Sequence, residues 1–136
     1  MTNHAAAPSA PAPRSRTIAL AFGLDVVLVV VFAIIGRASH AEHLTVEGVW
    51  QTAWPFLVGL VAGWLITMAW RAPLAPVRTG LGVWAVTLGG GMLLRGVARQ
   101  GTAVAFIIVA AIVLLLFLVG WRGIAALVRR RAAVAR

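Results

Sequence analysis

The stretch that decides the fold is TIALAFGLDVVLVVVFAIIG, residues 17–36, in which Asp25 is the one charged residue. A helix of this length spans about 30 Å, which matches the hydrocarbon thickness of a bilayer. Three more apolar blocks follow it, at about residues 49–70, 79–97 and 102–121. The pattern predicts an all-α membrane protein, an up-down bundle of four transmembrane helices with short connections.

The composition of the whole chain supports a membrane location. Of its 136 residues, 62% are hydrophobic and 11% are charged, whereas soluble domains have roughly 45–50% and about 25%. The chain has no cysteine, which excludes disulfides and thiolate metal sites. The net charge is +9, but the arginines flank the apolar blocks, so we expect them to contact anionic lipid headgroups rather than nucleic acid.

The flanks of the apolar blocks predict the domain limits and the orientation. Residues 1–16 are rich in Ala and Pro and are predicted to be a disordered tail, followed by the four-helix domain at 17–122. Residues 123–136 form a basic extension, which we expect to continue the fourth helix near the headgroups. With both termini inside, nine arginines lie on the cytoplasmic side and three on the other. This bias predicts cytoplasmic N and C termini in a multi-pass protein of the plasma membrane.

Tryptophans agree with this orientation. Trp50 and Trp54 mark the predicted outer boundary of the membrane. Trp-Arg pairs at 70–71 and 121–122 mark the predicted inner boundary. We therefore expect both pairs to lie in the cytoplasmic headgroup region.

Four short motifs occur in order along the chain: GRASH at 36–40, TAWPFLVG at 52–59, GMLLR at 91–95 and GWR at 120–122. Together they resemble a family of small bacterial four-helix membrane proteins catalogued as a domain of unknown function. The resemblance covers roughly residues 17–122. It implies a plasma-membrane location and a four-helix hydrophobic domain, and it implies no catalytic residue, substrate or cofactor.

Asp25 is the most informative residue, because a charge near the centre of a spanning helix costs roughly 2.5–3.5 kcal/mol. We expect its carboxyl group to face the bundle interior, where Thr87 and Trp64 lie at similar depth and offer donors. One interpretation is a proton or cation site, another is a buried hydrogen bond that fixes the first helix to the third, and another is a lone protonated acid. If Asp25 is structural, Asp25→Asn is expected to be mild and Asp25→Leu to loosen the bundle.

Arg95, near the outer end of the third helix, is the second costly residue. Pro55 lies at a similar depth and leaves the carbonyl of Gln51 without its helical donor. Arg95 is predicted either to bind that carbonyl, to pair with Glu47, or to extend into the headgroups. The candidate intramembrane polar site therefore comprises Asp25, Thr87, Trp64 and Arg95.

The outer loop RASHAEHLTVEG, residues 37–48, groups histidines and glutamates closely. Ser39 and Glu42 fit a capping box, so a short interfacial helix is expected. The spacing is compatible with metal ligands, but no second cluster exists, so we expect a solvated polar loop without a metal. Proton exchange by His40 is the other alternative. The candidate outer-loop site comprises Arg37, His40, Glu42, His43 and Glu47.

Glycines predict how the helices pack. Gly59 and Gly63 form a GxxxG pair, which lets two helix backbones approach closely. Gly89, Gly90 and Gly91 lie near the middle of the third helix and indicate either a local break that lines a cavity or a close helix crossing. No GK[ST] follows them, so they are not a phosphate loop, and we expect no cofactor.

Because the chain has no recognisable catalytic motif, we expect a non-enzymatic membrane protein. It is expected to act through assembly with its own copies or by binding another membrane protein. The alternative is a small transporter, or a proton- or ion-conducting protein, that uses Asp25 at mid-membrane. A lipid-active enzyme is the third alternative, since only the loop from His40 to Glu47 offers acid–base groups.

Overall fold

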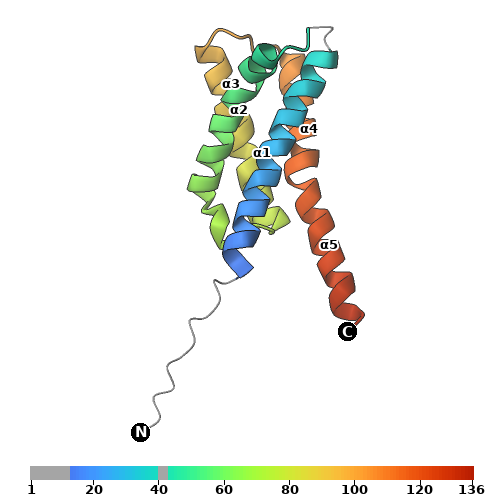
Figure 1. Cartoon of the computed structure of the whole chain (residues 1–136). Helices are drawn as coiled ribbons and strands as arrows, with labels where there is room; N and C mark the ends of the chain where they lie inside the picture. Colours follow the sequence, from blue (N-terminus) through green and yellow to red (C-terminus); the bar gives the residue numbers. More distant parts are fainter. Residues whose placement is uncertain (1–12, 40–42) are drawn as a thin grey trace.

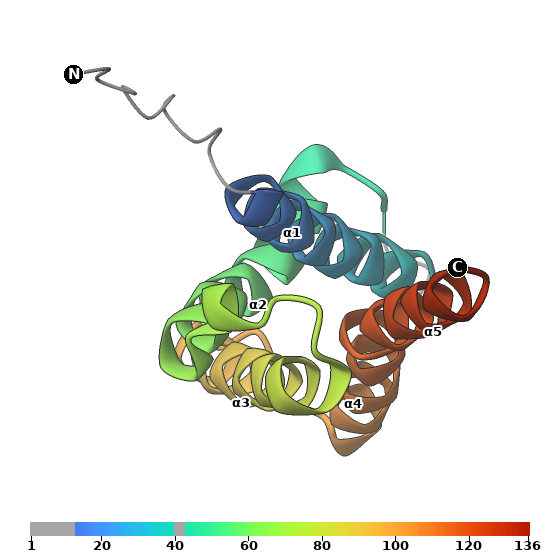
Figure 2. The same cartoon turned by 90° about the horizontal axis from the view of Figure 1, so that it is seen from below.

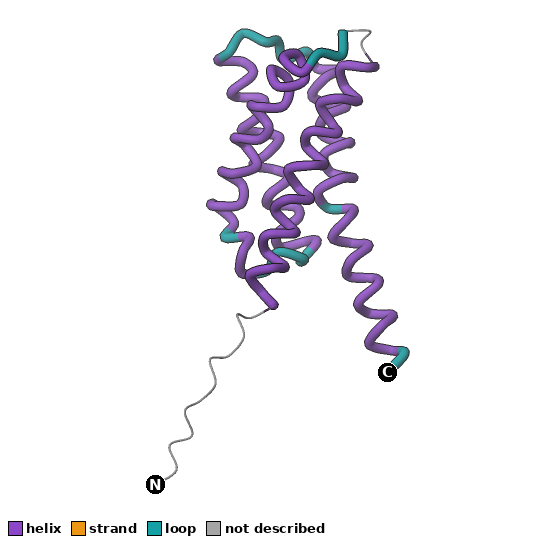
Figure 3. Tube along the Cα trace, in the orientation of Figure 1, coloured by secondary structure: helices purple, strands orange, loops and turns teal. Residues whose placement is uncertain are grey.

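All regular structure in the described part of the chain is helical. The computed structural model describes residues 13–39 and 43–136. The elements are α1 (Pro13–Ser39), α2 (Val46–Thr67), the 3₁₀ turn η1 (Ala69–Arg71), the π-helical turn η2 (Pro76–Leu81), α3 (Gly82–Val97), α4 (Val104–Leu118) and α5 (Gly120–Val134). The helices run up and down in one bundle (Figure 1), and loops join them at both of its ends (Figure 3).

Four helical stretches are long and apolar enough to cross a membrane. They are Arg14–Ser39, Val46–Thr67, Pro76–Val97 and Val104–Val134. The prediction of an all-α protein with four spans is therefore confirmed. Seen from below, the helices form a ring in the order α1, α2, α3 and α4, so α1 and α3 stand diagonally opposite each other (Figure 2). The beginning of α1 and the end of α5 lie at the same end of the bundle, which we call the terminal end (Figure 1).

The helices differ from the predicted apolar blocks mainly at their boundaries. The first helix begins at Pro13 rather than at 17, because proline is well tolerated in the first turn of a helix. The rest of the predicted tail, residues 1–12, lies outside the described residues. The second helix begins at Val46, where the hydroxyl of Thr45 accepts a hydrogen bond of 3.0 Å from the backbone N–H of Gly48.

The basic extension continues the fourth span, as expected. α5 follows α4 after a single non-helical residue, Val119, and projects beyond the rest of the bundle at the terminal end (Figure 1). The arginines at 129–131 in α5, and Arg136 after its end, are exposed. A basic helical segment therefore lies outside the packed core.

α2 and α3 cross closely because both present glycine at the contact. A β-carbon at Gly59 would stand 2.8 Å from the carbonyl oxygen of Thr87, and one at Gly91 would overlap the ring of Phe56. α3 is helical throughout the glycine triplet. Gly90 and Gly91 therefore serve the close crossing, whereas a β-carbon at Gly89 would meet nothing within 4 Å, and the alternative of a local break is excluded.

Candidate functional site

The carboxylate of Asp25 is fully buried and receives four hydrogen bonds. Trp64 Nε1 donates to Oδ2 and Trp121 Nε1 donates to Oδ1, each at 2.8 Å. Arg122 donates from Nη1 to Oδ1 at 2.9 Å and from Nη2 to Oδ2 at 2.7 Å. An ionised carboxylate offers about four acceptor positions, so these donors occupy all of them.

Arg122 is the counter-ion of Asp25 and is itself fully buried. Its Nε donates to the carbonyl of Pro73 and its Nη1 also donates to the carbonyl of Leu118, both at 2.8 Å. Its guanidinium carbon lies 4.6 Å from the centre of the Trp121 ring. Two parallel bonds to one carboxylate form the strongest common arrangement of an ion pair.

The ion pair joins segments that are far apart in the sequence. Asp25 belongs to α1, Trp64 to α2 and Arg122 to α5, while Pro73 lies in the connection between η1 and η2. A buried charge without its partner would destabilise the fold strongly. The four elements are therefore held together at the terminal end of the bundle by groups that are mutually satisfied.

This arrangement corrects two sequence-based expectations about Asp25. Thr87 is buried, but its hydroxyl has no hydrogen-bond partner, and α3 stands diagonally across the ring from α1. The carboxylate therefore joins α1 to α2 and α5, and the expected hydrogen bond between α1 and α3 is absent. Of the two predicted donors, Trp64 bonds to Asp25 and Thr87 does not.

Trp121 and Arg122 are the site residues that the sequence interpretation missed. The Trp-Arg pattern predicts that both lie in the headgroup region, together with the similar pair Trp70 and Arg71. Arg71 is exposed, whereas Arg122 turns inward to the acid. A single acid in an apolar helix indicates that a cation lies beside it. Because the Trp-Arg pattern occurs twice, the sequence does not identify which arginine is that cation.

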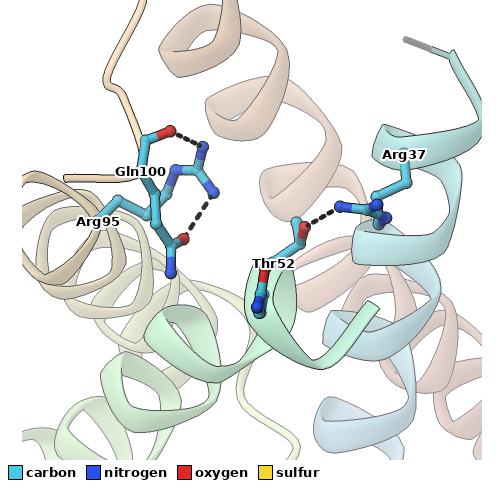
Figure 4. Close-up of a pocket in the computed structure, with 5 residues that line it drawn as sticks. Arg37, Thr52, Arg95 and Gln100 are labelled. Atoms are coloured by element: carbon cyan, nitrogen blue, oxygen red, sulfur yellow. Dashed lines mark hydrogen bonds between the residues drawn. The ribbon is translucent and has the colours of Figure 1, made fainter. Parts of the chain in front are cut away.

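Arg95 binds the connection that follows its own helix. It donates to the side-chain oxygen and the backbone carbonyl of Gln100, both at 3.2 Å, and to the carbonyl of Gly101 at 3.3 Å (Figure 4). Its guanidinium lies 4.2 Å from the centre of the Phe106 ring. These contacts place it at the far end of the bundle, opposite the terminal end and away from Asp25.

Arg37 plays a similar part at the end of α1. It donates to the carbonyl of His43 from Nε at 3.3 Å and from Nη2 at 3.0 Å, and to Thr52 Oγ1 at 3.5 Å. Ser39 does not cap a new helix: its hydroxyl donates to the carbonyl of Ile35, within the last turn of α1. Glu47 is exposed in the first turn of α2.

The rest of the candidate outer-loop site is only partly described. His40 and Glu42 lie outside the described residues. Within residues 13–39 and 43–136, no group of three His, Cys, Asp or Glu side chains is placed to hold a metal ion. The expected short interfacial helix is not formed at residues 43–45, which are non-helical up to the start of α2.

Comparison with known proteins places the chain in a family. No curated protein and no solved structure matches it. The sequence model of the family described as "Protein of unknown function (DUF3054)" matches residues 22–125, a range that includes Asp25, Trp64, Trp121 and Arg122. The matched range reaches from within α1 into α5 and covers most of the chain. The chain therefore belongs to the DUF3054 family.

Proposed function

We propose that this protein is a non-enzymatic integral membrane protein that acts by binding, either through assembly with its own copies or by docking to another membrane protein. In this proposal the four-helix bundle is a fixed scaffold, and contacts are made at its ends and its outer faces. The plasma membrane is the proposed location, and the terminal end faces the cytoplasm.

The saturation of Asp25 is the observation that supports a fixed scaffold. A transport residue must exchange a proton or an ion, which requires an acceptor position that a substrate can reach. Each oxygen of Asp25 already accepts two hydrogen bonds, and no part of the side chain is exposed. The alternative of a transporter or proton conductor that uses Asp25 requires at least one of these four donors to leave the carboxylate.

The distribution of arginines supports the proposed orientation. Arg122 is buried against Asp25, so it no longer counts as a headgroup residue. Eight arginines then remain on the side of the termini, against Arg37, Arg95 and Arg99 on the other. The excess still favours a cytoplasmic terminal end.

The length of the fourth span supports a contact with anionic headgroups. The span Val104–Val134 has 31 residues, which is about 46 Å of helix and exceeds the hydrocarbon thickness of about 30 Å. The last turns of α5 therefore extend past the hydrocarbon. Exposed Arg129, Arg130 and Arg131 lie there, next to exposed apolar side chains of Leu127 and Val128.

Ion flux in proteoliposomes tests the proposal. Vesicles with the wild-type protein are expected to have the same proton, sodium and potassium permeability as protein-free vesicles, because the buried carboxylate of Asp25 is inaccessible to ions. Wild-type flux that Asp25→Asn abolishes in folded protein would overturn the fixed scaffold and favour transport. Arg71→Gln serves as a control, because Arg71 follows Trp70 as Arg122 follows Trp121, but Arg71 is exposed.

A further inference from the structure

An apolar groove runs along the outer face of α2. It has a volume of about 450 Å³. The groove lies on the side of α2 opposite Gly59 and Gly63, the two glycines that contact α3. It therefore faces away from the bundle, toward the surrounding bilayer. All of its lining residues belong to α2: Trp50, Trp54, Leu57, Val58, Val61, Ala62 and Leu65.

A change in side-chain size along the helix forms the groove. The two tryptophans stand at its end nearest the far end of the bundle, and Leu65 closes its other end. The smaller side chains of Val58, Val61 and Ala62 lie between them. From Trp50 to Leu65 the helix rises about 22 Å, which exceeds the about 15 Å of hydrocarbon in one leaflet. The groove is therefore long enough for an extended hydrocarbon chain.

The two indoles at the end of the groove each have an unused hydrogen-bond donor. In the part of the chain that the structure describes, neither Trp50 nor Trp54 donates its indole N–H to a partner, whereas Trp64, Trp84 and Trp121 each donate theirs. An indole N–H only donates, so it needs an acceptor from its surroundings. Tryptophans at the end of a spanning helix sit at the headgroup level, where the lipids offer such oxygens.

The hydrogen-bonding groups of the lining favour a lipid over a second copy of the chain. A twofold contact between copies places the same face of each against the other. The lining offers the two indole donors, no side-chain acceptor and no charge. Two copies that met at the groove would therefore cover donors with donors, and a buried donor without an acceptor is costly. A phospholipid brings both an apolar chain and, at the head of that chain, an ester carbonyl.

We propose that this groove binds one acyl chain of a phospholipid, and that the ester carbonyl of that chain accepts a hydrogen bond from Trp50 or Trp54. The chain lies along Val58, Val61 and Ala62, where a recess in the helix surface adds contacts to those made on a flat face. Every lipid-facing helix touches acyl chains, but here the chain and its carbonyl are held together. The site does not involve Asp25, so it stands or falls independently of the ion-flux test.

Native mass spectrometry of the full chain in a non-ionic detergent tests the site. The probe is phosphatidylcholine, because its zwitterionic headgroup avoids the attraction that the arginines of α5 exert on anionic lipids. Saturable binding of one lipid molecule is expected. The ether-linked analogue, with the same chains and headgroup but no ester carbonyl, is expected to bind several-fold more weakly. Equal binding of the two lipids, or the absence of saturable binding, would overturn the proposal.

Two variants with the same change in size test the groove itself. Ala62→Phe fills the recess from a position that faces away from the bundle, and it is expected to weaken lipid binding by about tenfold. Ala85→Phe makes the same change on the exposed face of α3, outside the groove, and is expected to leave binding unchanged. Equal weakening by both variants would overturn the site. A wild-type dimer that Ala62→Phe converts to a monomer would assign the groove to a second copy and overturn the lipid proposal.

A further variant tests the hydrogen bond and keeps the shape of the groove close to that of the wild type. Trp50→Phe combined with Trp54→Phe retains an aromatic ring at both positions and removes both indole N–H groups. This double variant is expected to bind the ester-linked lipid as weakly as the ether-linked one, while its helical circular dichroism stays close to that of the wild type. It keeps the proposal testable if Ala62→Phe does not fold. A preference for the ester-linked lipid that survives in the double variant would contradict the role of the indoles.

Discussion

At the scale of single residues, Asp25 and Arg122 explain how an acid is tolerated inside an apolar helix. Each charge alone would be costly to bury. Together they form a bidentate pair, and Trp64, Trp121 and the carbonyls of Pro73 and Leu118 satisfy more of the polar atoms. The charge that made Asp25 a candidate transport residue is therefore explained by the stability of the fold.

Removal of one charge of this pair is expected to be severe. Asp25→Asn leaves Arg122 charged and buried. The N–H groups of the amide introduced at position 25 would face other donors. We expect a loss of about 3–5 kcal/mol in the free energy of unfolding, measured by titration with sodium dodecyl sulfate in mixed micelles. This replaces the sequence-based expectation that Asp25→Asn is mild.

The double variant Asp25→Leu with Arg122→Met is the matched control for that loss. Because both charges leave together, it is expected to recover at least half of the stability lost in Asp25→Asn. A double variant as unstable as the single one would indicate that the tryptophan hydrogen bonds, rather than the ion pair, stabilise this region.

Thr87 makes a second prediction at this scale. Its hydroxyl is buried on α3 and has no hydrogen-bond partner. A buried hydroxyl without a partner costs roughly 1–3 kcal/mol by mutational estimates, and Val has nearly the same shape. Thr87→Val is therefore expected to raise the free energy of unfolding by on the order of 1 kcal/mol, in the same titration. A loss of stability would contradict the absence of a hydrogen-bond partner for this hydroxyl in the bundle.

The sequence predicts Asp25 as a site and Trp64 as one of its donors, but not its counter-ion Arg122. Burial of Asp25 follows from the cost of a charge among lipid chains, which depends on the residue itself. The choice of Arg122 depends on how α5 is rotated and how deep it lies, which only the tertiary packing determines. Thr87 shows a second limit: counting residues along each helix estimates depth, but depth does not reveal which helices are neighbours in the ring.

At the scale of elements, the helices themselves are predictable because length and hydropathy are local properties. Their ends depend on finer features, such as the hydroxyl of Thr45 that begins α2 and Met68, whose φ of 49° ends it. The GxxxG pair of Gly59 and Gly63 predicted a close crossing, and the structure shows α3 as the partner. The sequence alone does not name that partner, since small residues also occur on the first helix.

The crossing of α2 and α3 is expected to be sensitive to one added methyl group. In Gly59→Ala the new β-carbon stands 2.8 Å from the carbonyl oxygen of Thr87, and a backbone cannot yield without separating the helices. We expect a loss of about 1–3 kcal/mol in the free energy of unfolding. Gly89→Ala, whose β-carbon meets nothing within 4 Å, is expected to be neutral or stabilising. Equal losses would contradict the close crossing.

α5 gives a prediction about lipid composition. Because the chain has no cysteine, Ala133→Cys provides a single site for an environment-sensitive fluorophore. Its emission is expected to shift to shorter wavelength in nanodiscs of phosphatidylglycerol relative to phosphatidylcholine, since the exposed arginines attract anionic headgroups. Gln at 129–131 or added salt should reduce the shift. An emission that is independent of lipid charge would contradict the headgroup contact.

At the scale of the whole molecule, the two ends of the bundle differ in kind. The terminal end contains the saturated ion pair and the projecting basic helix, and the far end contains an open polar cavity between Arg37 and Arg95. The acid at the terminal end is satisfied by side chains from three helices, whereas Arg37 and Arg95 at the far end donate to backbone carbonyls of the connections that follow their own helices. The terminal end is therefore stabilised by a buried ion pair, and the far end by arginine contacts with its connecting segments.

The same asymmetry depends on orientation, which labelling from either side of the membrane can determine. Single cysteines at Ser15 and Ala135 report on the terminal end, and one at Thr102 reports on the far end. With an impermeant thiol reagent, Ser15→Cys and Ala135→Cys are expected to react in inside-out vesicles only, and Thr102→Cys in right-side-out vesicles only. The inverse pattern would place the terminal end outside the cytoplasm and overturn the proposed orientation. Reaction of Ser15→Cys and Ala135→Cys from opposite sides would contradict four spans altogether, because an even number of crossings returns the chain to the side on which it began.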